Sequence, residues 1–238
     1  MKAGIIAAGL GERLKKSGVF TPKPLIKIAG EPLIKRAIRA ATYAGAKRIA
    51  CIVNEVEKKV SAYLKSQSWP VPLDLVVKTT PSSMESLFNL APFLDEPFLL
   101  LTVDAVFSFD TLKEFVDRAK TLGGDGALAI TQYVDDEKPL WVKIGSDSRI
   151  IGIGDEFRPT PYITAGFYFF RPAIFELMER AREKNLSALR YFLSYLVKEG
   201  FAIYGIQVQK VIDLDYPEDI KKAEDFLRGQ AHEYIRDI

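Results

Sequence analysis

The chain has 238 residues, of which 33 are Lys or Arg and 31 are Asp or Glu, so its formal charge is +2. This near balance gives no electrostatic reason to expect nucleic acid or a membrane as a partner. One Cys and one His exclude zinc sites built from thiolates or imidazoles, and they argue against a His-based catalytic triad. The first residues lack the apolar length of a signal peptide, and no run approaches a membrane span, so we expect a cytoplasmic protein.

Short apolar runs alternate with segments of helical periodicity along the first half of the chain. The expected strands are Ala3–Ala8, Arg48–Val53, Leu73–Lys78, Phe98–Thr102 and Gly126–Thr131. The expected helices are Pro32–Ala44, Glu55–Gln67, Ser83–Leu90 and Asp110–Thr121. This alternation predicts an α/β fold with a mostly parallel sheet and helices on both faces.

The middle of the chain has a different pattern. Strand-like runs at Trp141–Gly145, Arg149–Ile153 and Ile163–Phe170 predict a small mixed or antiparallel extension of the sheet. The remaining expected elements are helices at Pro172–Ala181, Ala188–Glu199 and Pro217–Leu227 and a strand at Ala202–Gln207. The sequence has no repeat and no flexible linker, so we expect residues 1–238 to form a single domain with a lobe around 132–170.

A turn with two glycines follows the first expected strand, between Ala7 and Leu14. We expect Ala8, Gly9 and Gly11 to lie against a bound anion, because glycines let backbone N–H groups approach closely. Open α/β sheets also bind ligands beyond the carboxyl ends of their strands. A P-loop is excluded because no Gly-Lys-Ser/Thr follows, and the dinucleotide fingerprint would need a third Gly where Leu14 stands. An ordinary structural turn is the alternative.

Two cations follow this turn. Arg13 comes two residues after Gly11, and Lys23 lies between two prolines that stiffen its loop. A guanidinium binds phosphate as a fork and an ammonium acts as a point charge, so together they suit a polyphosphate. The alternative is that both are solvated surface charges. We expect Lys23 to be an exposed cation whose replacement leaves thermal stability almost unchanged.

The motif Gly9-Leu10-Gly11-Glu12-Arg13-Leu14, followed by Lys23-Pro24-Leu25 and Gly30-Glu31-Pro32-Leu33-Ile34, resembles the sugar-1-phosphate nucleotidyltransferases, which make nucleoside-diphosphate sugars. The resemblance runs from Lys2 to about Leu227 and departs at Glu12, where that family usually has Thr. It implies a Rossmann-like fold of the nucleotide-diphospho-sugar transferase type. It also implies transfer of a nucleotidyl group from an NTP to a sugar 1-phosphate, with Arg13 and Lys23 as catalytic residues at the β- and γ-phosphates.

Three aspartates are candidates for holding the Mg²⁺ that nucleotidyl transfer requires. Asp104 ends an apolar run and should emerge at the carboxyl edge of a central strand, where a helix cap is the alternative role. The resemblance implies that this Asp is catalytic and binds the metal. Asp213 and Asp215 share one face of an extended segment. The family's closing Asp-x-Pro-Glu-Asp-Leu motif implies Asp215 as the second ligand, with Asp213 as a nearby support, and capping of the next helix competes for Asp215.

The nucleoside is expected at Ser82 and Ser83, which stand where similar enzymes carry a small-residue stretch, often Gly-Thr-Ala. That stretch lets the nucleoside lie close to the backbone at a helix N-terminus. The two hydroxyls could bond ribose or base, and an ordinary Ser N-cap is the alternative. Because the usual residues are absent, the base cannot be assigned from the resemblance.

The acceptor is expected near Gly166, which resembles the family's glycine that admits the sugar. Glu156 stands where the family often has Glu-Lys-Pro, but the Lys is missing here. Arg158 is therefore the expected substitute at the acceptor phosphate, and Lys143 is another candidate cation. Each of these two cations has the alternative of being only a surface charge.

The expected partners are an NTP and a small phosphorylated acceptor. Within the enzyme class, the acceptor could instead be phosphocholine, inositol phosphate or molybdopterin. A glycosyltransferase is less expected because the strand end at Asp104 offers a single Asp rather than Asp-x-Asp. From another class, the chain could be a catalytically silent nucleotide-binding module, although the joint presence of Arg13, Lys23, Asp104 and Asp215 speaks against it. The sequence leaves the oligomeric state open, a homo-oligomer included.

Overall fold

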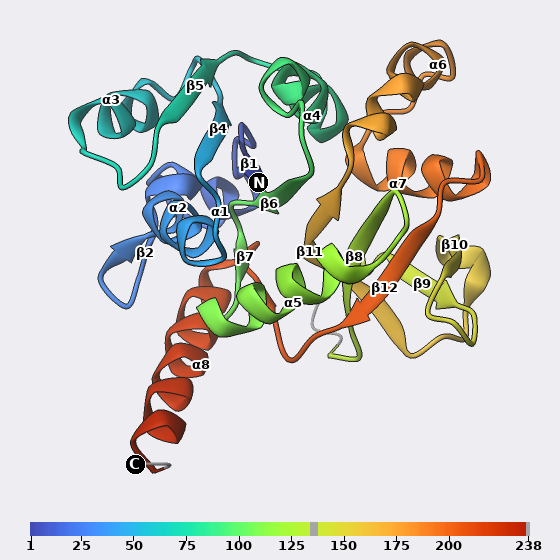
Figure 1. Ribbon diagram of the computed structural model, residues 1–238. Helices are drawn as coiled ribbons and strands as arrows, with labels where there is room; N and C mark the ends of the chain where they lie inside the picture. The colour runs from blue at the N-terminus through green and yellow to red at the C-terminus, as the bar shows by residue number, and fades with distance from the viewer. Residues whose placement is uncertain (134–137, 237–238) are drawn as a thin grey trace.

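Figure 1 shows the chain as a computed structural model, which describes residues 1–133 and 138–236 and the side chains as far as residue 229. The expected lobe around 132–170 thus includes four residues, 134–137, that lie outside the described part. No helix of the described residues is both long enough and apolar enough to cross a membrane.

A nine-stranded sheet forms the centre of the molecule. Its strands are β1 (Lys2–Ala7), β4 (Arg48–Val53), β5 (Leu73–Val77), β6 (Phe98–Thr102), β8 (Gly126–Thr131), β9 (Trp141–Ile144), β10 (Ile150–Ile153), β11 (Tyr162–Phe170) and β12 (Ile203–Gln207). Strands β5, β4, β1 and β6 are neighbours in that order and run parallel. The next strand, β11, runs antiparallel to β6, β8 and β9, and β10 completes the hairpin with β9. The α/β fold with a mostly parallel sheet and an antiparallel extension is therefore confirmed.

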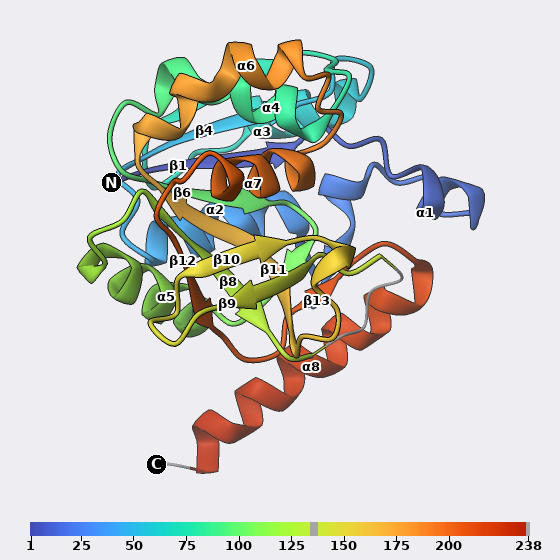
Figure 2. The ribbon, with the colours of Figure 1, turned by 90° about the vertical axis from the view of Figure 1, so that its right-hand side faces the viewer.

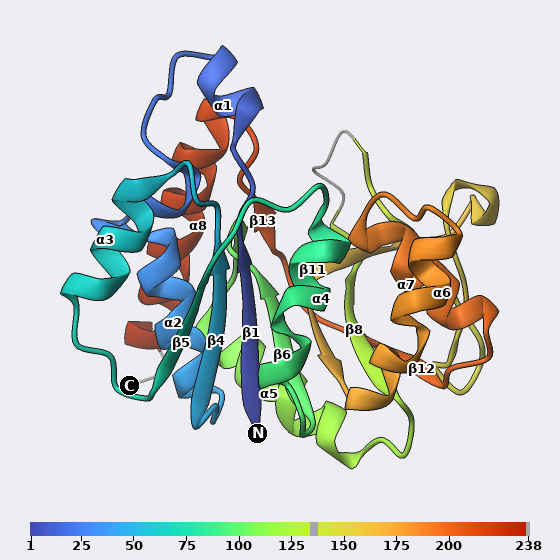
Figure 3. The ribbon, with the colours of Figure 1, turned by 90° about the horizontal axis from the view of Figure 1, so that it is seen from above.

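The strands are buried on both faces, as their apolar runs predict. In β1, Ala3, Ile5 and Ala7 pack into one apolar cluster, whereas Ile6 points into the other. Helices α2 (Leu33–Tyr43), α3 (Lys58–Ser66), α5 (Phe109–Thr121) and α8 (Pro217–Arg236) supply buried residues to the first cluster. Helices α4 (Ser83–Leu90), α6 (Met178–Glu183) and α7 (Leu189–Lys198) supply the second cluster, on the opposite side of the sheet in Figure 3.

Smaller elements lie around the edges of the sheet. They are α1 (Glu12–Lys16), the 3₁₀ turns Lys23–Leu25, Ala91–Phe93, Asp155–Phe157 and Pro172–Leu177, and two short antiparallel pairs, β2 (Lys27–Ile28) with β3 (Glu31–Pro32) and β7 (Ala105–Val106) with β13 (Ile212–Asp213). The pair of β7 and β13 joins the end of β6 to the segment before α8.

The structure differs from the sequence expectations at three helices. Helix α3 begins at Lys58 rather than Glu55, because the Asn54 side chain accepts a hydrogen bond from the Val56 N–H and holds a local turn there. The segment expected as one helix from Pro172 is a 3₁₀ turn that continues into α6. Helix α8 extends past the expected end to Arg236 and runs away from the sheet in Figure 2.

Candidate active site

The carboxyl ends of β1, β4, β5 and β6 meet at one edge of the sheet, where two pockets adjoin. The first, which we call the turn pocket, has a volume of about 570 Å³ and is lined by the turn after β1, by residues 79–83, and by Lys23, Asp104 and Asp215. The second, the β11 pocket, has a volume of about 330 Å³ and lies over residues 163–166 of β11. Both pockets are lined by Ser83, Thr102 and Asp104, so they form neighbouring halves of one site.

The strand pairing explains where the β11 pocket forms. Residues 167–170 of β11 pair with β6, whereas Tyr162 and Ile163 pair with β9. The pairing with β8 on the other edge shifts register between Thr164 and Tyr168. Residues 164–166 lie between the part of β11 that pairs with β9 and the part that pairs with β6. They line the pocket beside Asp104, together with Tyr133 and Arg190 from outside the strand.

The turn after β1 packs directly on Lys23. Gly11 has a φ of +61°, in the left-handed region that favours glycine. A Cβ at this position would lie 3.2 Å from the Cβ of Lys23. The glycine therefore lets the turn and the Lys23 loop lie together, and α1 begins directly after it.

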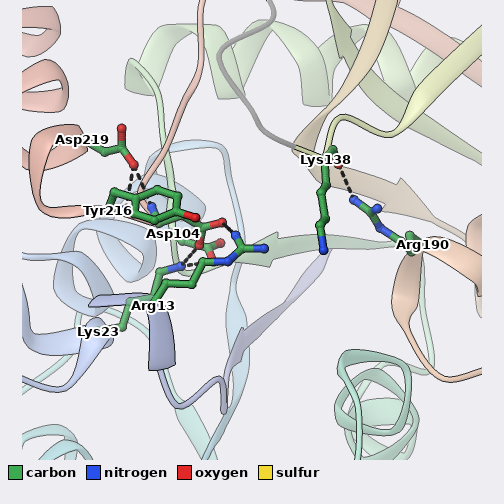
Figure 4. A network of polar contacts seen from close by, with 8 residues as sticks. Arg13, Lys23, Asp104, Lys138, Arg190, Tyr216 and Asp219 are labelled. Carbon is green, nitrogen blue, oxygen red and sulfur yellow. Dashed lines mark hydrogen bonds and ion pairs between the residues drawn. The ribbon is translucent and has the colours of Figure 1, made fainter. Parts of the chain in front are cut away.

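Lys23 is the central cation of the site. Its Nζ lies 2.8 Å from Asp104 Oδ2 and 2.9 Å from Asp215 Oδ1, and the residue is only 8% exposed. Arg13 pairs with the other carboxylate oxygen of Asp215. Figure 4 shows Arg13 and Lys23 side by side next to Asp104. The expectation that Lys23 is an exposed cation is therefore wrong, because the two aspartates enclose it.

The electrostatics of this cluster favour the charged forms of Lys23 and Asp104. Burial by itself lowers the pKa of Lys23, but the carboxylates of Asp104, Asp213 and Asp215 outweigh it and raise that pKa above its ordinary value. Burial likewise raises the pKa of Asp104, and the charge and hydrogen bond of Lys23 outweigh it and lower that pKa. The Lys23 ammonium and the Asp104 carboxylate thus form a charged pair.

The three candidate metal ligands lie together. One carboxylate oxygen from each of Asp104, Asp213 and Asp215 lies within 4.8 Å of the others. The pairing of Asp213 with Ala105 brings the segment before α8 to the end of β6, and the Leu214 N–H donates to the Asp104 carbonyl at 3.1 Å. An all-oxygen, carboxylate-rich set suits a hard divalent cation such as Mg²⁺.

The competing capping role at the start of α8 falls to a different aspartate. Asp219 Oδ2 accepts hydrogen bonds from the N–H groups of Tyr216 and Asp215 at 2.8 and 3.1 Å, as in a capping box. The ring of Tyr216 lies 5.8 Å from the Arg13 guanidinium. The Asp215 carboxylate instead pairs with Arg13 and Lys23.

Asn54 is a site residue that the sequence analysis missed. Its side chain is buried at the end of β4, where Nδ2 donates to the Ala8 carbonyl at 3.1 Å and Oδ1 accepts from Thr79 at 2.9 Å. These bonds tie the ends of three strands into the floor of the turn pocket. A polar residue directly after an apolar strand was the available signal, but Asn is common in turns.

The two candidate serines have structural partners. Ser82 caps α4 by accepting from the Glu85 N–H at 3.2 Å, which confirms the N-cap alternative for that residue. Ser83 Oγ accepts from the Leu189 N–H at 2.9 Å and so anchors the start of α7. Both serines line the turn pocket.

Gly166 lies where β11 faces the end of β6. It has a φ of +77°, and a Cβ there would lie 2.8 Å from the Cβ of Ala105 and 3.1 Å from Thr102 Oγ1. The same Thr102 hydroxyl donates to the Gly166 carbonyl at 3.1 Å. The glycine is therefore needed for the close packing of the two strands beside Asp104.

Replacing this glycine tests that packing. We expect Gly166→Ala to lower stability by about 1–3 kcal/mol, because it combines a left-handed backbone with a steric clash. Gly123→Ala is a matched control, since a Cβ there meets nothing within 4 Å. Thermal unfolding of the two variants checks the difference, and equal melting temperatures would contradict the close approach at Gly166.

Three of the expected acceptor residues lie elsewhere. Among the described residues that line the two pockets, Lys143, Glu156 and Arg158 do not occur. Arg158 instead pairs with Asp155 at 3.1 Å, and its guanidinium lies 4.6 Å from the Trp141 ring. Their role at the acceptor stays a prediction, whereas Arg190, which lines the β11 pocket, was missed.

The chain is similar to known proteins over most of its length. The pattern described as the MobA-like NTP transferase domain matches residues 3–194. The UTP–glucose-1-phosphate uridylyltransferase AglF of Haloferax volcanii is 24% identical over 97% of this chain and 98% of its own length. The bifunctional IPC transferase and DIPP synthase of Archaeoglobus fulgidus is 26% identical over 97% of this chain, which spans 44% of that protein.

The fold is shared with solved structures. The inositol-1-phosphate CTP transferase from T. maritima superposes with a TM-score of 0.77 and 21% identity, covering 92% of this chain and 90% of its own. The relatives include sugar-1-phosphate nucleotidyltransferases, and this confirms the resemblance found in the sequence. The matched pattern includes the glycine turn, both cations and Asp104, and the chain therefore belongs to the MobA-like NTP transferase family.

Proposed function

We propose that the chain transfers a nucleotidyl group from an NTP to a sugar 1-phosphate, giving an NDP-sugar and pyrophosphate. The observation that carries the proposal is the meeting of two pockets at Asp104, with Lys23 and Arg13 on one side of it. A transferase needs such an arrangement, because both substrates must present their reacting phosphates at one point. A silent binder of one nucleotide would not need the second pocket.

The turn pocket would take the NTP and the β11 pocket the acceptor. Ala8, Gly9 and Gly11 would face the nucleotide through their backbone, and Arg13 and Lys23 would offset the negative charge on the β- and γ-phosphates. An acceptor phosphate oxygen would attack the α-phosphorus, and the bond to the β-phosphate bridging oxygen would break in line. No general base is required, because a phosphate dianion is already a nucleophile at neutral pH.

Asp104, Asp213 and Asp215 would hold Mg²⁺. The fit is supported by their three neighbouring carboxylate oxygens and by the absence of softer ligands among the described residues of that cluster. When bound, the ion would supply Lewis-acid stabilisation of charge at the α-phosphate. Lys23 and Arg13, which pair with carboxylates of this cluster, would then turn to the phosphates of the NTP.

The acceptor class and the domain organisation are part of the proposal. Inositol phosphate is the second candidate acceptor, favoured by the likeness in fold to the inositol-1-phosphate CTP transferase. The whole of 1–238 would act as one catalytic domain. Its segment around 132–170 would carry the acceptor side of the site, since residues 163–166 line the β11 pocket.

A substrate matrix tests the proposal directly. ATP, CTP, GTP, UTP and dTTP are each combined with glucose 1-phosphate, mannose 1-phosphate, inositol 1-phosphate and phosphocholine, and pyrophosphate release is measured with Mg²⁺. We expect release with at least one sugar or inositol phosphate, its loss on adding EDTA, and its return with excess Mg²⁺. No release with any pair would favour a silent nucleotide-binding module instead.

A further inference from the structure

Arg190 is placed to face the acceptor. It is the second residue of α7 and lines the β11 pocket. Its Nη2 donates to the carbonyl of Lys138 at 2.7 Å. Figure 4 shows Lys138 and Arg190 on the opposite side of the site from Arg13 and Lys23, with Asp104 nearer the latter pair.

The positive charge of Arg190 differs from the charges of the other titratable residues that line the β11 pocket. The titratable lining groups are the carboxyls of Asp104 and Asp213, the phenols of Tyr133 and Tyr168, and Arg190. Burial raises the pKa of Tyr168, so its phenol stays neutral. Arg190 is therefore the cation among the described lining residues. Apart from the two carboxyls, the other lining side chains carry hydroxyls or are apolar.

The start of α7 holds Arg190 firmly. The neighbouring Leu189 N–H is bonded to Ser83, which lines both pockets. On the buried face of α7, the ring of Phe192 lies 5.0 Å from that of Phe88 in an edge-to-face contact. The start of the helix is thus anchored by packing and by Ser83, and the guanidinium is bonded to the Lys138 carbonyl.

We propose that Arg190 determines acceptor specificity by binding an anionic group of the acceptor and by rejecting alcohol phosphates that carry an ammonium group. The inference rests on the proposed transfer reaction and deepens it. A guanidinium binds a phosphate or carboxylate with two hydrogen bonds. The same charge repels a quaternary ammonium, so the pocket selects sugar or polyol phosphates over phosphocholine. The anionic group is either the reacting phosphate or a second acid at the far end of the acceptor.

The test compares Arg190→Gln with wild type, with Arg149→Gln and with Arg158→Gln. Arg149 is a matched control because it also donates to a carbonyl, that of Gly200 at 3.3 Å, outside both pockets. Affinities for glucose 1-phosphate, glucuronic acid 1-phosphate and phosphocholine are measured by calorimetry in the presence of a non-hydrolysable NTP. The kcat and KM for each acceptor are measured from pyrophosphate release.

In Arg190→Gln we expect the affinity for the best anionic acceptor to fall about 10- to 100-fold, the scale of a lost hydrogen bond to a charged group. The KM for the NTP should change little, and discrimination against phosphocholine should shrink. Equal losses for the two sugar phosphates identify the reacting phosphate as the group bound, and a larger loss for the glucuronic acid derivative identifies a far acid.

Three results would overturn the inference. The first is an unchanged acceptor affinity in Arg190→Gln alongside active wild type, which leaves the proposed reaction standing. The second is a loss of acceptor affinity in Arg158→Gln with none in Arg190→Gln, which would assign binding of the acceptor to Arg158, as expected from the sequence. The third is no binding of any phosphomonoester by wild type, which removes the inference and the proposed acceptor class together.

Discussion

Asp104→Asn is expected to lower turnover at least about 100-fold while the protein keeps its fold. The amide is a poorer ligand for a hard divalent cation, and removing one strong electrostatic contributor typically has an effect of this size. The fold should persist because Asn has the same shape and Lys23 keeps its bond to Asp215 at 2.9 Å. Steady-state turnover and thermal unfolding of the same preparation check the two parts.

The controls for this prediction use other carboxylates. Asp74→Asn removes an aspartate paired with Arg48 at 2.6 Å, outside the two pockets, and should leave turnover unchanged. Asp213→Asn and Asp215→Asn, made separately, decide which of the two is the second ligand. A larger loss at Asp213 would reverse our choice of Asp215, and near-normal turnover of Asp104→Asn at saturating Mg²⁺ would remove the metal assignment.

Lys23→Ala is expected to impair both catalysis and stability. Without the ammonium, Asp104 and Asp215 repel each other in a partly buried site. Breaking a buried ion pair costs about 3–5 kcal/mol. We expect about 3 kcal/mol, because the Asp104 and Asp215 side chains keep 27% and 28% of their surface exposed. For a chain of this size that loss lowers the melting temperature by roughly 6–12 °C.

The catalytic part of this prediction is read from kcat/KM for the NTP, which should fall about 100-fold. Lys23→Arg should recover stability better than activity, because a guanidinium keeps the charge but differs in shape and reach. Adding Mg²⁺ should raise the melting temperature of Lys23→Ala more than that of wild type, since the ion can replace the missing positive charge. Normal kcat/KM with a large loss of stability would make Lys23 a purely structural cation.

The sequence by itself determined most of the sheet and one end of the site. The bounds of β4, β6 and β8 agree with the expected strands, because an apolar run bounded by polar residues reports burial on both faces. The position of Asp104 at a strand end follows from the same run. The glycine turn and the two cations could be found because their residues are close together in the chain.

Only the tertiary structure decided which charges meet. Lys23 and Asp215 are 192 positions apart, and no local pattern tells that they pair or that Lys23 is buried. The β11 pocket likewise depends on long-range pairing, since β11 lies between β6 and β8. Arg190 looks like any charged residue on an amphipathic helix until α7 docks on Ser83. Periodicity specifies which face of an element is buried, whereas the neighbours of that face are set by the packing of the whole chain.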